Sequence, residues 1–182
     1  MPPYVESGLR LDLPAGLHFR FADTTAYNAV KGQSLKEMDF AWVDSGKLFL
    51  LEVRSYSQVT QTLTLTDFVP VKGQPEPFRF NALIDKVTDS VLMMFSAWAD
   101  TAWGQQLKAE LPASARARMP LKLVVAVELP TALTIHLQGL RDSLNARLRG
   151  RVALADVGSV VLIDYSRLIS DPAFKGFVAL QP

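Results

Sequence analysis

Two acidic residues, Asp39 and Glu52, lie in apolar stretches whose neighbouring positions offer them few charged partners. Two carboxylates that face each other away from water repel, and desolvation adds a cost of several kcal/mol for each charge. A divalent cation is the simplest compensator, because carboxylate oxygens are ligands that Mg²⁺ and Mn²⁺ prefer. These residue types therefore indicate metal-assisted chemistry if the fold brings them together.

A β-hairpin is the element that would do so. Residues Met38–Val43 and Lys47–Val53 are rich in Phe, Trp, Leu and Val, as strands are. The sequence Asp44-Ser45-Gly46 between them is typical of a turn. We expect two paired strands joined by this tight turn.

The turn also predicts which residues face each other. With Ser45-Gly46 as the loop, the numbers of two facing residues sum to 91 (45 + 46). This register sets Asp39 opposite Glu52 and Glu37 opposite Arg54. Because side chains alternate along a strand, all four should project from one face. Three acids and one base are thus predicted to converge.

This pattern resembles the PD-(D/E)XK nuclease superfamily, in which an acid on one strand and an acid on the next bind Mg²⁺. The family places a Lys two residues after the second acid; here the sequence reads Asp39, then Glu52-Val53-Arg54. The resemblance implies that Asp39, Glu52 and the carbonyl of Val53 bind Mg²⁺ or Mn²⁺. It implies a catalytic role for Asp39, Glu52 and Arg54. Arginine remains protonated, so Arg54 can bind phosphate but cannot act as a general base.

Two further residues are candidates for this site. Glu37 is either a third acidic ligand or the ion-pair partner of Arg54, and the predicted register allows both. Lys86 lies early in a predicted helix and either supplies an ammonium to the site from another direction or is a solvated helix residue.

The rest of the chain predicts the elements that support the hairpin. Alternating residues in Leu9–Leu13 and Leu17–Phe21 indicate a first hairpin, and Leu121–Leu129 and Ser159–Tyr165 indicate buried strands. A helix should begin near Pro77, with an apolar stripe that recurs at spacings of three and four. The stripe is formed by Ile84, Val87, Val91, Met94, Phe95 and Trp98.

A second helix, with a leucine stripe from Leu133 to Leu148, should end near Gly150. The order of strands, helix, strand, helix and strand predicts an α/β fold with a mixed central sheet flanked by helices. This order also resembles the restriction-endonuclease-like core of the nuclease superfamily. The outer face of the second helix bears Arg141, Arg147 and Arg149, which either contact nucleic-acid phosphates or form a solvated face.

The amino-acid composition indicates the number of domains and the kinds of chemistry and partner that are expected. A chain of 182 residues with 49% apolar and 20% charged residues suits one globular domain, residues 1–182. With 19 basic and 18 acidic residues, any charge that attracts nucleic acid must be local. The absence of cysteine excludes disulfides and thiolate chemistry. No apolar run approaches the ~20 residues that span a bilayer, so a cytoplasmic protein without membrane partners is expected.

Three hypotheses follow from the sequence. The first is an active metal-dependent nuclease that acts on nucleic acid. The second is a nuclease-like module without catalysis, which binds nucleic acid, a protein partner or a second copy of itself. The third is an unrelated α/β protein in which Glu37, Arg54, Asp39 and Glu52 form a structural charge network.

Overall fold

The computed structural model describes residues 3–57, 64–174 and 176–181. The fold is α/β, and its central five-stranded mixed sheet has the order β3-β4-β5-β6-β7. The strands are β1 (Tyr4–Glu6), β2 (Leu9–Leu11), β3 (His18–Phe19), β4 (Phe40–Asp44), β5 (Lys47–Ser55), β6 (Leu121–Glu128), β7 (Val161–Asp164) and β8 (Val178–Leu180). The α-helices are α1 (Thr25–Asn28), α2 (Phe78–Trp98), α3 (Ala102–Glu110), α4 (Leu137–Ala153) and α5 (Tyr165–Ser170). Short 3-10 helices are η1 (Phe21–Asp23), η2 (Lys31–Gln33), η3 (Leu65–Asp67), η4 (Ala113–Ala115) and η5 (Thr131–His136).

The central hairpin is confirmed, together with its register. Strands β4 and β5 are antiparallel, with Asp44 opposite Lys47 and Phe40 opposite Leu51. Strand β3 pairs with β4 in the antiparallel sense, whereas β5, β6 and β7 are mutually parallel. The long helices α2 and α4 are the connections that parallel neighbours require.

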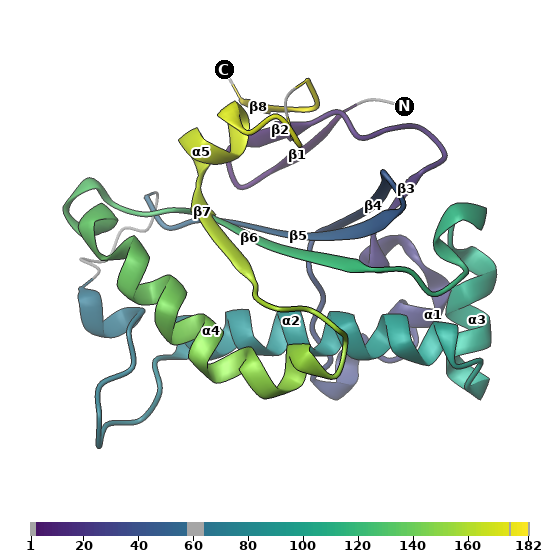
Figure 1. The fold of residues 1–182 in the computed structure, drawn as a ribbon, viewed down its shortest axis with the longest axis horizontal. Helices are drawn as coiled ribbons and strands as arrows, with labels where there is room; N and C mark the ends of the chain where they lie inside the picture. The colour runs from purple at the N-terminus through teal and green to yellow at the C-terminus, as the bar shows by residue number, and fades with distance from the viewer. Residues whose placement is uncertain (1–2, 58–63, 175, 182) are drawn as a thin grey trace.

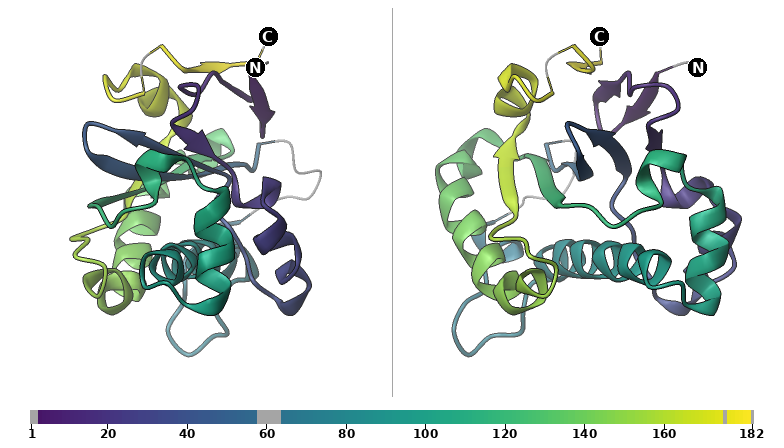
Figure 2. Two further views of the ribbon diagram at one scale, coloured as in Figure 1. Left: turned by 90° about the vertical axis from the view of Figure 1, so that its right-hand side faces the viewer. Right: turned by 45° about the vertical axis from the view of Figure 1, so that its right-hand side comes forward.

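The sheet has a different cover on each face. Helices α2 and α4 lie on one face, and a small sheet of order β1-β2-β8 lies with α5 on the other (Figures 1 and 2). Leu50 and Val125 belong to the core on the helix side, while Trp42 and Leu51 belong to the core beneath the small sheet. The alternation of side chains along β4 and β5 thus fills two separate cores.

Helix α2 forms because its apolar residues follow the helical period. Ile84, Val87, Val91 and Met94 are buried, as the predicted stripe requires. The stripe packs α2 along the sheet and so fixes which of its residues can reach β5. No helix within the described ranges is long and apolar enough to cross a membrane.

The predicted first hairpin is wrong. Strand β2 (Leu9–Leu11) does not pair with β3; it lies between β1 and β8 in the small sheet. The hairpin instead joins β1 to β2 through Ser7 and Gly8, which both have positive φ. The segment Pro14-Ala15-Gly16 lies in the connection that leads from the small sheet to the central one.

The predicted end of the second helix is also wrong. Helix α4 continues through Gly150 to Ala153. The same helix binds the residue that directly precedes β7. The Asn145 side chain donates to the Val160 carbonyl (3.0 Å) and accepts from the Val160 N–H (2.8 Å), as a neighbouring strand would.

The contact between α2 and α3 depends on Gly104. A Cβ at this position would lie 1.9 Å from the carbonyl oxygen of Ser96 and 2.3 Å from its carbon. We predict that Gly104→Ala lowers the free energy of unfolding by about 1–3 kcal/mol or more, because backbone must move to admit the methyl group. Urea unfolding measures the change. Gly150→Ala is the control: it lies in α4 with open space around it, so it should stabilise the protein by about 0.5–1 kcal/mol. Equal effects of the two substitutions would contradict the close contact.

Candidate functional site

Asp39 and Glu52 come together at one end of the central hairpin, as predicted. The observed pairing ends with Phe40 opposite Leu51, Asp39 and Glu52 are the next residues, and both carboxylates face α2. The Glu52 side chain is 1% exposed and that of Asp39 is 14% exposed. The two carboxylates therefore lie almost out of water on strands that are otherwise apolar.

Lys86 of α2 lies between them. Its Nζ is 3.2 Å from Asp39 Oδ1, and 2.7 Å and 2.8 Å from the Glu52 oxygens Oε1 and Oε2. The solvated alternative for Lys86 is therefore wrong. In the structure Lys86 lies on the same side of α2 as the buried Leu83, three residues before it, and the buried Ser90, four residues after it.

Asp39, Glu52 and Lys86 form a triad, and their charges depend on one another. Burial, and then the nearby charge of Asp39, raise the pKa of Glu52 well above its ordinary value, although Lys86 partly offsets this. Burial alone would lower the pKa of Lys86, but Glu52 and Asp39 raise it overall. The Lys86 ammonium hydrogen-bonds Oε2 of Glu52, whereas the buried Oε1 has no hydrogen bond of good geometry.

The arrangement fits a cation. The position of Lys86 Nζ shows that one cation can contact both carboxylates. Asp39 is oriented by Val53, whose N–H donates to Asp39 Oδ2 (2.8 Å). The N–H and carbonyl of one strand residue point toward the same neighbouring strand, so the Val53 carbonyl also points toward the Asp39 side. Among the described residues, no group of three or more His, Cys, Asp or Glu could bind a metal, so backbone and water would complete the ligand set.

Glu37 does not belong to this triad. Strand β4 begins only at Phe40, so the alternation that would set Glu37 opposite Arg54 does not extend that far. Glu37 instead accepts a hydrogen bond from the Tyr27 hydroxyl, which raises the pKa of Tyr27 after the larger effect of burial. The predicted Glu37–Arg54 ion pair is absent from the described part of the chain.

Arg54 lies beside the triad rather than within it. It is exposed on β5, two residues after Glu52, and its charge lowers the pKa of Tyr56, which burial raises by more. A small pocket of about 30 Å³ lies between the end of β5 and the start of α2. Its lining consists of Glu52, Arg54, Tyr56, Phe78, Arg79, Ala82, Leu83 and Lys86.

The arginines predicted to contact phosphate are exposed but do not form one patch. Arg147 forms an ion pair with Glu76 (3.1 Å), and Arg141 Nε lies 3.4 Å from Asp142. Arg141 lines a hollow against β7, while Arg149 is exposed farther along α4. Their contact with nucleic acid stays a prediction.

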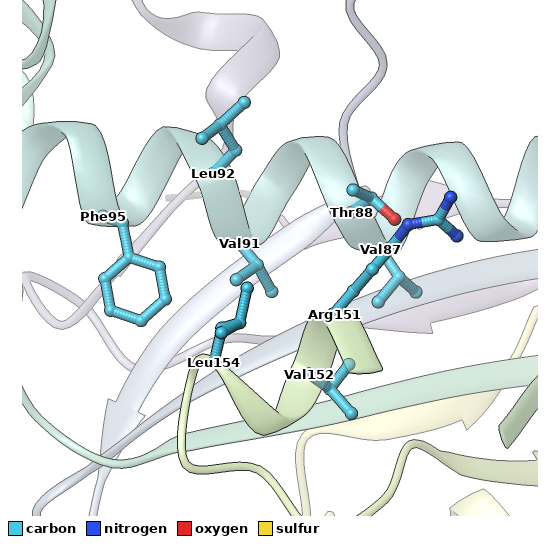
Figure 3. A pocket seen from close by; sticks show the side chains of 8 residues that line it. All are labelled: Val87, Thr88, Val91, Leu92, Phe95, Arg151, Val152 and Leu154. Atoms are coloured by element: carbon cyan, nitrogen blue, oxygen red, sulfur yellow. The ribbon is translucent and has the colours of Figure 1, made fainter. Parts of the chain in front are cut away.

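A larger apolar hollow lies elsewhere. It lies between α2 and the C-terminal end of α4 (Figure 3). Its volume is about 210 Å³. Thr88 and Arg151 are its polar residues, and it contains no carboxylate. It lacks the groups for acid–base or metal chemistry.

Comparisons with known proteins do not add to this evidence. A scan against protein-family models, a search of curated proteins and a search of solved structures each find no match to this chain.

Proposed function

We propose that this protein is a metal-dependent phosphodiesterase that hydrolyses nucleic acid, with a restriction-endonuclease-like core. Asp39 and Glu52 would bind Mg²⁺ or Mn²⁺, and Lys86 would supply the ammonium that the family pattern places at Arg54. The observation that supports this most is the position of Lys86 Nζ, which lies within 3.2 Å of both carboxylates.

The topology is compatible with the proposal. The antiparallel strands β3, β4 and β5 are followed by α2 and by β6, which is parallel to β5. The nuclease superfamily has the same sequence of elements, with the acids on its second and third strands. In this chain Asp39 precedes the second of these strands directly, and Glu52 lies in the third.

Each residue of the site would have a separate role. Asp39, Glu52 and the Val53 carbonyl would provide oxygen ligands, and the bound cation would activate water and neutralise phosphate charge. Lys86 occupies the space between the acids, so its side chain must move aside when a cation enters. A phosphate would then give its ammonium a new anionic partner. Cation and phosphate would therefore each favour binding of the other.

The first test is stabilisation by metal. At about 100 times Kd a bound cation adds roughly 2.7 kcal/mol, which should raise Tm by about 5–10 °C in a chain of this size. Asp39→Asn with Glu52→Gln should abolish the rise. The matched control, Asp44→Asn with Asp156→Asn, removes two exposed acids and should retain it. A rise in the site variant equal to that of the wild type would contradict the metal site.

The second part of the test is cleavage of single-stranded and duplex DNA and RNA with Mg²⁺ or Mn²⁺. Metal-dependent cleavage that Asp39→Asn removes would support the nuclease. Binding without cleavage would favour the module that lacks catalysis, with nucleic acid or a protein as its partner. If the protein neither cleaves nor binds, the triad is a structural charge network.

A further inference from the structure

Residues of β5 and α2 form a track that leads away from the triad. On β5, Glu52 and Arg54 lie on the same face because they are two residues apart. On α2, Phe78, Ala82 and Lys86 are spaced by four and therefore share one side of the helix. All five line one pocket, and along α2 the track extends about 12 Å from Lys86 to Phe78.

Phe78 ends this track with an exposed ring. Its side chain is 80% exposed, whereas Phe80, two residues later, is 1% exposed. Among the large apolar residues that are exposed in the described ranges, Phe78 is aromatic and the others are aliphatic. An aromatic ring in water next to a charged pocket is typical of surfaces that stack nucleic-acid bases.

Positive charge accompanies the ring. Arg54 and Arg79 line the same pocket, and neither forms an ion pair with a described residue. Arg79 lies 5.6 Å from the ring centre of Tyr56, which orients its guanidinium. The charge of Arg79 also acts on Asp67, whose pKa is lowered mainly by hydrogen bonds from Thr64 and only slightly by Arg79.

We propose that Phe78, Arg54 and Arg79 bind an unpaired nucleotide of single-stranded nucleic acid next to the triad. The base would stack on Phe78, and the arginines would contact the phosphates that lead toward Lys86. Inside a duplex both faces of a base are already stacked, so Phe78 can take only a base that is unpaired. The pocket, at about 30 Å³, is too small to enclose a base, which therefore lies on its rim.

This inference rests on the proposed function for its substrate class, but its test needs no cleavage. Affinity for a fluorescent single-stranded oligonucleotide and for a closed hairpin duplex is measured by anisotropy, in EDTA and in Ca²⁺. Phe78→Ala should weaken single-strand binding by about 5- to 150-fold, as loss of one stacked base does, and Phe78→Trp should preserve it. Arg79→Ala should reduce the slope of log affinity against log salt by about one.

Ile135 provides the matched control. It is also 80% exposed but lies in η5, away from the pocket, so Ile135→Ala should leave the affinity unchanged. Equal losses in Phe78→Ala and Ile135→Ala, equal losses on single strand and duplex, or no binding of single strands would each overturn the proposal. Loss of binding in Phe78→Ala without any cleavage would refute the enzyme and retain the nucleotide site.

Discussion

Replacing Lys86 by Met should lower the free energy of unfolding by about 3 kcal/mol, because one partner of a buried ion pair is lost. The substitution preserves most of the side-chain volume but leaves Asp39 and Glu52 facing each other without a cation. The control is Lys108→Met, which breaks a pair with the exposed Asp100 and should cost less than about 1 kcal/mol. Urea unfolding in EDTA measures both.

The loss in Lys86→Met should depend on pH. Burial and Asp39 raise the pKa of Glu52 above its value in the unfolded chain, so the folded state binds the proton more tightly. Stability linked to this group is present at low pH and is lost as the pH rises through the folded pKa. Without Lys86 the shift grows, so the variant should recover stability as the pH falls from about 8 to about 5.

Divalent cations distinguish the metal site from a structural network. If Mn²⁺ can occupy the position of Nζ, it should raise the Tm of Lys86→Met by more than that of the wild type, because no ammonium competes. A destabilised variant that Mn²⁺ does not rescue would identify the triad as structural. A cost no larger than that of Lys108→Met would contradict the ion pair itself.

Replacement of the basic residues Lys86 and Arg54 should change the cleavage rate, and Lys86→Ala should have the largest effect. Lys86→Ala removes the ammonium nearest the acids and should lower cleavage by about 10²–10³-fold, as loss of one group that stabilises developing charge does. Arg54→Ala should have a smaller effect, since Arg54 is exposed and lies outside the triad. Arg54→Lys should leave cleavage intact or raise it. Combined with Lys86→Ala, it should restore part of the activity.

Lys86→Arg separates chemistry from folding. It preserves the positive charge, so it should unfold at nearly the wild-type urea concentration, yet a planar guanidinium does not reproduce the position of the compact ammonium between the two acids. Cleavage should therefore fall while stability remains. If Arg54→Ala lowers cleavage by more than Lys86→Ala does, the basic catalytic residue is Arg54 of β5 and not Lys86.

The part of the site that depends on local sequence was predictable. A two-residue turn at Ser45-Gly46 fixes the register of the strands that it joins, and this register places Asp39 and Glu52 directly after the last observed pair, Phe40 with Leu51. The apolar stripe likewise predicted α2. The contact of Lys86 with the acids was not predictable to the same degree, because it depends on how α2 is rotated about its axis against the sheet, and packing determines that rotation.

The missed elements have a different cause. Glu37 was assigned to the hairpin face because sequence does not show where pairing stops, and β4 begins three residues later. The partner of β2 is β8, with Leu11 opposite Val178, so the pairing joins segments from the two ends of the chain. Local patterns contain no information on such distant pairing.

The ends of the central sheet affect how separate molecules meet. A strand at the edge of a sheet offers unpaired N–H and carbonyl groups to any other chain, and long flat edges promote aggregation. Here the edge strands are short, with two residues in β3 and four in β7. Just before β7, the Asn145 amide binds both backbone groups of Val160. These two groups are therefore not available to pair with a strand of another molecule.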